Sequence, residues 1–108
     1  MRIIAGPCQH ETLELSLQIA EECKRVCDLH NIEYIFKASF DKANRSSMQG
    51  KRGVGLGQTL QAFEKIKDKT GVKTLTDVHT TQQIKDISNW FNHTVDVLQI
   101  PAFLCRPT

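Results

Sequence analysis

Polar or reactive side chains follow each of the four short apolar runs that the sequence predicts as buried strands. They are Cys8, Lys37, Ser39, Asp77, His79 and Gln99. The carboxyl ends of parallel strands lie on one side of a sheet or barrel, which is where ligands bind in such folds. We therefore expect these side chains to gather in one site.

The segment after the second run is rich in cations, with Lys37, Lys42, Arg45, Lys51 and Arg52 against the single acid Asp41. Neutral donors stand among them, namely Asn44, Ser46 and Ser47. Arginine and lysine beside hydroxyl groups are typical of a receptor for phosphate or carboxylate. The same composition also suits a solvated basic loop, and the Walker-type phosphate motif is absent.

Alternating patterns predict an α/β fold of order β-α-β-α-β-α-β. The expected strands are 3–5, 32–37, 72–77 and 95–100, and the expected helices are 12–29, 56–69 and 81–91. This order favours parallel strands, as in a doubly wound sheet or a (β/α)8 barrel. Four strands are too few to close a barrel, so we expect residues 1–108 to be the N-terminal part of a single domain.

Side-chain patterns also predict which residues are buried. The inward face of the first helix is expected to hold Leu15, Ile19, Ala20, Cys23, Val26 and Cys27. Trp90 and Phe91 are expected to pack the third helix. Asp77 and His79 are expected to point apart rather than pair. The remaining histidines are expected at the surface or as helix caps, and they are His10, His30 and His93.

The composition excludes several classes of protein. The 108 residues are 40% hydrophobic and 24% charged, which is ordinary for a globular domain. A net charge of +2 is too small to indicate nucleic acid as the main partner. No apolar run approaches the ~20 residues that span a bilayer. We expect a cytoplasmic protein that binds neither nucleic acid nor membrane.

Four segments closely resemble the 3-deoxy-D-manno-octulosonate 8-phosphate synthase family, and the segment 36–47 is the most specific of them. The others are 4–8, 75–79 and 98–106. The resemblance implies the first half of a (β/α)8 barrel and, at full length, a homotetramer. It also implies condensation of phosphoenolpyruvate with arabinose 5-phosphate, with release of phosphate, on the route to lipopolysaccharide.

The resemblance further implies roles for individual residues. Lys37, Lys42 and Gln99 look like ligands of phosphoenolpyruvate, and Ser39 belongs to the same substrate site. Contacts with arabinose 5-phosphate fall on Asn44, Arg45, Ser46 and Asp77, and Arg106 resembles a residue that reaches a neighbouring subunit's phosphate site. Lys42, Asn44 and Asp77 are the expected catalytic residues.

Cys8 raises the question of a metal. A thiolate at the end of the first strand can bind a divalent cation, whereas a free cysteine is more often a buried, inert side chain. The resemblance favours the metal, because the family's metal-dependent branch has cysteine here. It implies Zn²⁺, Fe²⁺ or Mn²⁺, with the other ligands beyond Thr108.

Two other readings remain open. One is a 3-deoxy-arabino-heptulosonate 7-phosphate synthase, a sister enzyme that shares the barrel and phosphoenolpyruvate. The other is a non-catalytic half-barrel that acts as a binding or assembly module. We expect the 108-residue chain alone to be inactive and poorly soluble, because its first and fourth strands would be open edges and its helices would lack half their packing partners.

Overall fold

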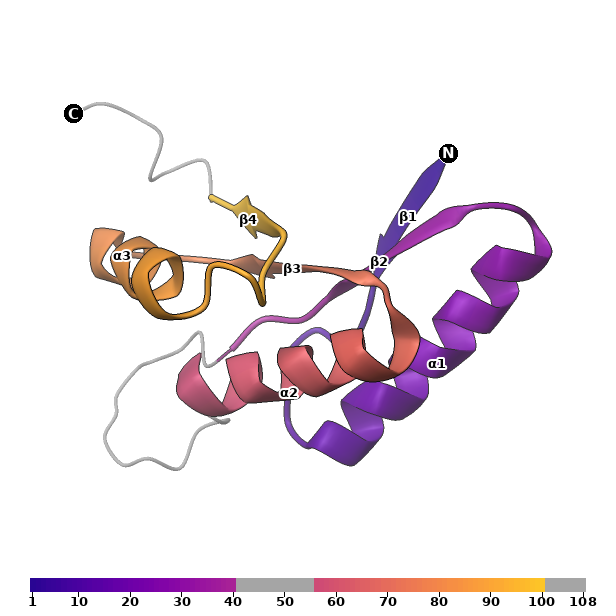
Figure 1. Cartoon of the computed structure of the whole chain (residues 1–108), viewed down its shortest axis with the longest axis horizontal. Coiled ribbons are helices and arrows are strands. Elements are labelled where there is room, and N and C mark those ends of the chain that lie inside the picture. Colours follow the sequence, from indigo (N-terminus) through magenta and orange to yellow (C-terminus); the bar gives the residue numbers. More distant parts are fainter. Residues whose placement is uncertain (41–55, 101–108) are drawn as a thin grey trace.

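The computed structural model describes residues 1–40 and 56–100. Strands and helices alternate along the chain, as the sequence predicts (Figure 1). The elements are β1 (Arg2–Ala5), α1 (Leu13–Leu29), β2 (Glu33–Lys37), α2 (Leu56–Thr70), β3 (Lys73–Asp77), α3 (Thr81–Trp90) and β4 (Val97–Gln99). The observed strand β4 is shorter than the expected 95–100, and the other boundaries agree within a few residues.

The sheet decides between the two expected architectures. Its four strands are all parallel and follow the chain order β1-β2-β3-β4. A doubly wound sheet reverses its strand order at a switch point, whereas a barrel adds each new strand beside the last. The described residues therefore form an α/β arrangement that matches half of a (β/α)8 barrel, and β1 and β4 are its edges.

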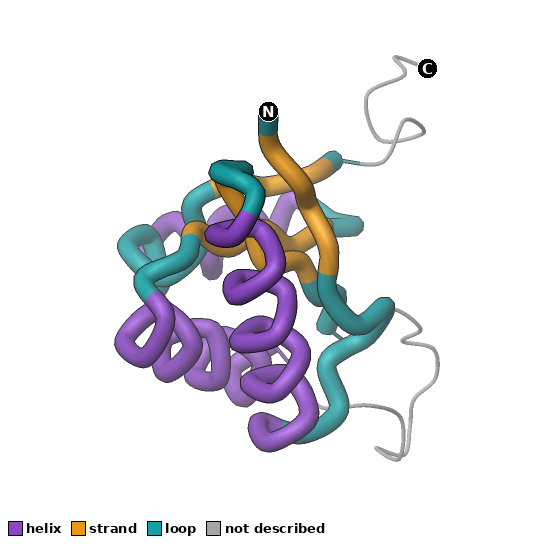
Figure 2. Tube along the Cα trace, turned by 90° about the vertical axis from the view of Figure 1, so that its right-hand side faces the viewer, coloured by secondary structure: helices purple, strands orange, loops and turns teal. Residues whose placement is uncertain are grey.

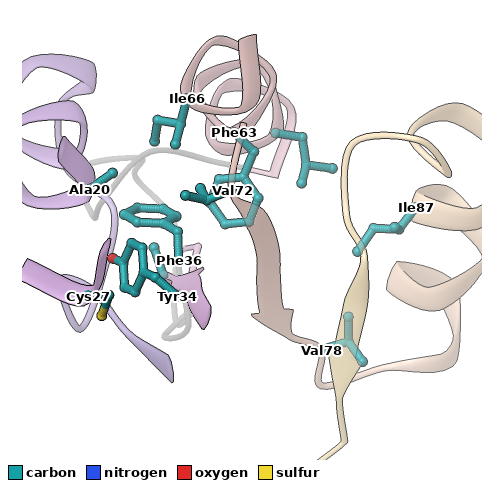
Figure 3. Packing of buried hydrophobic residues seen from close by; sticks show 11 residues of the cluster. Ala20, Cys27, Tyr34, Phe36, Phe63, Ile66, Val72, Val78 and Ile87 are labelled. Atoms are coloured by element: carbon teal, nitrogen blue, oxygen red, sulfur yellow. The ribbon is translucent and has the colours of Figure 1, made fainter. Parts of the chain in front are cut away.

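The helices α1 and α2 lie together on one face of the sheet (Figure 2), and Ile84 and Ile87 of α3 pack in the same core cluster. Alternate residues of β2 point toward the helices, and Tyr34 and Phe36 enter the core cluster (Figure 3). Ala38, directly after β2, belongs to the same cluster. The ring of Phe36 meets Phe63 of α2 edge-on, with ring centroids 5.5 Å apart. Such aromatic contacts add to the burial energy, so β2 lies at the centre of the helix-side core.

Capping residues and a glycine mark the ends of the helices. Thr12 and Thr80 cap α1 and α3, and each threonine hydroxyl accepts a hydrogen bond from a backbone N–H in the first helical turn. After α2, Gly71 adopts a φ of 76°, and its N–H donates to the carbonyl of Lys67. Only glycine enters this left-handed region without strain, so Gly71 ends α2.

Three burial predictions are wrong. Leu15 and Val26 of α1 are 42% and 41% exposed, and Trp90 of α3 is 73% exposed. Helical periodicity defines an apolar stripe but not its width, and only the Ala20 and Cys27 side of α1 faces the core. Phe91, by contrast, packs against the core as predicted. Within the described residues, no helix combines the length and apolarity that crossing a membrane requires.

The sheet face away from the helices carries two polar layers, and the layer at the amino ends of the strands is a cluster of charges. We call it the amino edge, and it consists of Arg2, Glu33 and Lys73. Glu33 contacts Arg2 Nε at 2.7 Å and Lys73 Nζ at 3.5 Å. These contacts hold the pKa of Glu33 below its ordinary value, mainly through the hydrogen bond from Arg2.

Candidate functional site

A second polar layer lies at the opposite ends of the strands. We call it the carboxyl edge, and it consists of Lys37, Ser39, Asp77 and Gln99. Its best-defined contact joins two strands, because Ser39 Oγ donates a hydrogen bond to Asp77 Oδ1 at 2.6 Å. Ser39 is almost fully buried, and the Asp77 side chain is 13% exposed. The expected gathering of β2 and β3 residues is confirmed.

Backbone and side-chain bonds fix β2 against β3 directly beneath this contact. Thr76 Oγ1 donates to the carbonyl of Ala38 at 2.8 Å, and the N–H of Ala38 donates to the carbonyl of Leu75 at 3.3 Å. Thr76 is buried, so its hydroxyl bond is shielded from water and costly to lose. The buried bonds of Thr76 and Ala38 set the distance between Ser39 and Asp77.

The other two members of the carboxyl edge come from the ends of β2 and β4. Asp77 and Gln99 are register partners, and the carbonyl of Gln99 accepts a hydrogen bond from the N–H of Val78 at 3.0 Å. Gln99 is exposed and Lys37 is half-buried. Lys37 is the register partner of Leu75, two residues before Asp77, so an amide and an ammonium group lie on the two strands that flank β3.

The prediction that Asp77 and His79 point apart is wrong. His79 Nε2 lies 3.3 Å from Asp77 Oδ2. Side chains alternate between faces along a strand, so residues two apart point the same way, and this spacing brings the pair together. The backbone N–H of His79 also donates to Gln83 Oε1 at 2.7 Å. The spacing Thr80-x-x-Gln83 resembles a capping box. This motif is the feature of the sequence that could have predicted a bond from the Gln83 side chain to the backbone at the start of α3.

The prediction that His10 lies at the surface or caps a helix is also wrong. It is neither at the surface nor a cap: it is 3% exposed, and its Nδ1 lies 2.7 Å from Ser16 Oγ. Burial lowers the pKa of His10, and the nearby charge of Glu11 only partly opposes this effect. The backbone N–H of His10 donates to the carbonyl of Ser39 at 2.8 Å. His10 therefore ties the connection between β1 and α1 to the carboxyl edge.

Two further contacts hold the end of β1 against β2. The hydroxyl of Tyr34 donates to the carbonyl of Ala5 at 2.7 Å, and burial raises the pKa of that phenol. A Cβ atom added to Gly6 would lie 1.9 Å from the carbonyl oxygen of Lys37. Only glycine permits so close an approach of the two backbones.

Cys8 lies on the connection between β1 and α1, and its thiol is exposed. Its carbonyl accepts a hydrogen bond from the N–H of Ser39 at 3.2 Å, which places Cys8 beside the carboxyl edge. A thiolate is a suitable ligand for zinc or iron. Residues 1–40 and 56–100 contain no group of three or more His, Cys, Asp or Glu side chains arranged to hold a metal. Cys8 fits the role of one ligand and does not by itself make a site.

Five of the expected site residues lie outside the described residues. They are Lys42, Asn44, Arg45, Ser46 and Arg106. The other expected residues are Cys8, Lys37, Ser39, Asp77 and Gln99. All of these fall at the carboxyl ends of the strands or directly after them.

Comparison with known proteins gives the family. The model of the DAHP synthetase I family matches residues 1–108. The chain belongs to this family. The matched range includes the strand-end residues described above.

Curated relatives are similar over nearly the whole of this chain. The 2-dehydro-3-deoxyphosphooctonate aldolase of Fusobacterium nucleatum is 51% identical over 106 residues, or 98% of this chain and 37% of the relative. The proteins of the same name from Dechloromonas aromatica and Campylobacter jejuni strain 81-176 are 50% and 47% identical, over 98% and 100% of this chain. The chain spans 37% or 38% of the length of these relatives.

Proposed function

We propose that the full-length protein containing this chain condenses phosphoenolpyruvate with D-arabinose 5-phosphate and releases inorganic phosphate. The product would be 3-deoxy-D-manno-octulosonate 8-phosphate, a precursor of lipopolysaccharide. The observation that carries the proposal is the carboxyl edge, where Ser39 donates a hydrogen bond to the Asp77 carboxylate and Lys37 and Gln99 lie on the two flanking strands. The name shared by relatives that are 47–51% identical supports the same reaction.

The proposed chemistry forms one carbon–carbon bond. The double-bond electrons of phosphoenolpyruvate form a bond from its C3 to the aldehyde carbon of the sugar, and the aldehyde oxygen takes up a proton. Water adds at C2, and the bond between C2 and the phosphate oxygen then breaks to release phosphate. Holding both substrates face to face supplies much of the rate, because it converts an encounter into a local reaction.

In this proposal, each group of residues has a task that suits its charge. Lys37, Lys42 and Gln99 bind phosphoenolpyruvate, because its carboxylate and phosphate require fixed cations and donors. Asp77 accepts hydrogen bonds from sugar hydroxyl groups. The remaining sugar contacts are assigned to Asn44, Arg45 and Ser46, and Arg106 is assigned to the phosphate site of a neighbouring subunit.

We further propose that Cys8 is a ligand of a divalent ion (Zn²⁺, Fe²⁺ or Mn²⁺), with its other ligands outside this chain. When bound, such an ion would polarise a carbonyl oxygen as a Lewis acid. Treatment of the full-length protein with a chelator is expected to abolish activity, and added metal to restore it. Full activity in metal-free protein would contradict the assignment.

The full-length enzyme is also proposed to be a cytoplasmic homotetramer, on the family resemblance alone. Analytical ultracentrifugation of the full-length protein tests the oligomeric state. A monomer that is fully active would contradict both the tetramer and the role assigned to Arg106 between subunits.

The substrate assay tests the central proposal. Phosphoenolpyruvate consumption by the full-length protein should depend on arabinose 5-phosphate, and erythrose 4-phosphate should be a poor substitute. The family description names DAHP synthetase, so the sister reaction is the second candidate. Equal rates with the two aldehydes would favour that candidate, and no consumption with either would favour a binding module.

A matched pair of lysines tests the basic segment. Lys42→Ala should lose far more activity than Lys51→Ala, because only Lys42 lies in the segment that resembles the family. Similar losses for the two variants would indicate a diffuse basic patch instead.

A further inference from the structure

The carboxylate of Asp77 is held from two sides by side chains of different elements. Ser39, just after β2, donates to Oδ1 at 2.6 Å. His79, just after β3, places Nε2 3.3 Å from Oδ2. The two contacts use different oxygen atoms, so together they define the plane of the carboxylate.

His79 is itself held in place by the start of α3. Its backbone N–H donates to Gln83 Oε1 at 2.7 Å, and Gln83 in turn donates its backbone N–H to the N-cap Thr80 at 3.1 Å. The His79 side chain is 31% exposed. The ring therefore stands partly in solvent beside Asp77, on a backbone that the first turn of α3 fixes.

One contact alone would leave the carboxylate free to turn. Rotation about the Cβ–Cγ bond of an aspartate is broad, and a hydrogen bond to Oδ1 restrains only one end of the group. An ionised carboxylate offers about four acceptor positions. With Ser39 and His79 on separate oxygens, the remaining acceptor positions keep a fixed direction.

We infer that His79 is a positioning residue that fixes the Asp77 carboxylate for sugar hydroxyl groups. The inference rests on the proposed function, because it deepens the role given there to Asp77. His79 acts through Asp77, and Gln83 acts through the backbone of His79. His79 and Asp77 therefore determine how well the sugar phosphate is held, and they do not bind phosphoenolpyruvate.

Steady-state kinetics of the full-length protein test the inference. Two proteins are suitable for the assay. One is the product of the complete reading frame around this chain, and the other is a chimera in which this chain replaces the matching residues of the Fusobacterium nucleatum relative. His79→Ala is expected to lower kcat/KM for arabinose 5-phosphate about tenfold, which is the effect of one lost orienting contact. KM for phosphoenolpyruvate should not change. His79→Gln should recover most of the loss, because its amide nitrogen can reach the position of Nε2.

Two controls separate positioning from a general loss of structure. His93 is 71% exposed and lies 3.8 Å from Glu64, so His93→Ala should leave the kinetics unchanged. In the background of Asp77→Asn, His79→Ala should cause less than about a twofold further loss, because residues that act through one contact are not additive. Additive losses, or no loss in His79→Ala, would overturn the inference.

Crystal structures of the parent protein and His79→Ala give a readout that is independent of activity. The Asp77 carboxylate is expected to turn about its Cβ–Cγ bond when the ring is removed. An unchanged carboxylate plane would overturn the inference. A parent protein that does not consume phosphoenolpyruvate with arabinose 5-phosphate would contradict the proposed function, and the comparison of structures would still decide the role of His79.

Discussion

The two ends of the same sheet face use polar side chains in opposite ways. At the amino edge, the carboxylate of Glu33 meets Arg2 and Lys73, two side chains of opposite charge. At the carboxyl edge, the carboxylate of Asp77 meets a hydroxyl group and an imidazole. Exposed charges paired with charges contribute little beyond local order. The contacts of Asp77 leave acceptor positions on its carboxylate, and the proposed function assigns these positions to a ligand.

The largest expected effect is a difference in kcat/KM between variants of the Asp77 and Glu33 carboxylates. In the full-length protein, Asp77→Ala should lower kcat/KM for arabinose 5-phosphate by about 100-fold, because it removes the side chain proposed to accept hydrogen bonds from sugar hydroxyl groups. Glu33→Ala, the matched change at the amino edge, should leave kcat/KM nearly unchanged. Equal losses in the two variants would end the distinction between the edges.

Substitutions of two glycines, Gly6 and Gly57, test whether the carboxyl edge depends on the close approach of the backbones of Gly6 and Lys37. Gly6→Ala would place its Cβ 1.9 Å from the carbonyl oxygen of Lys37, so β1 must move away from β2. We expect a loss of about 2–3 kcal/mol in the free energy of unfolding. Gly57 in α2 has open space around it, and Gly57→Ala should be neutral or stabilise by up to about 1 kcal/mol.

Thermal unfolding of the full-length variants measures this difference. If Gly6→Ala is as stable as Gly57→Ala, the close contact between Gly6 and Lys37 does not fix the position of β1 at the carboxyl edge. Because Lys37 is assigned to phosphoenolpyruvate, a raised KM for that substrate in Gly6→Ala would sharpen the link between the contact and the site.

The smallest expected effect concerns Asp96, which lies just before β4 and beside the amino end of β3. Asp96 Oδ2 accepts from Lys67 Nζ at 2.5 Å and from the backbone N–H of Thr74 at 2.9 Å. Burial alone would raise the pKa of Asp96, but these two bonds outweigh it and hold the pKa below its ordinary value. The ionised form therefore stabilises the fold.

The sign of the pH dependence follows from that lowered pKa. The contribution is complete above the ordinary aspartate value of about 3.9 and is lost as the pH falls through the lowered value. Asp96→Asn should cost about 1 kcal/mol near neutral pH and almost nothing in strong acid, with kcat unchanged. Asp86→Asn, on the exposed side of α3, serves as the control. A cost that does not vary with pH would contradict this role of Asp96.

Much of the fold could be predicted from local patterns in the sequence. The predicted alternation of strands and helices is confirmed. The cap at Thr12 and the end of α2 at Gly71 likewise depend on neighbouring residues. Periodicity could not tell that Leu15 and Val26 would lie outside the packed face of α1. Which side of a helix finds a partner depends on elements distant in the chain.

The same division applies to the candidate site. The sequence by itself determined which chemical groups follow each strand, and it placed Ser39 and Asp77 among them. Only the tertiary structure decided that Ser39 bonds to Asp77, that His79 completes the contact and that His10 is buried against Ser16. The bond between Ser39 and Asp77 joins residues 38 positions apart. Such a contact depends on strand register and on buried bonds such as that of Thr76 to Ala38, which no local pattern of residues contains.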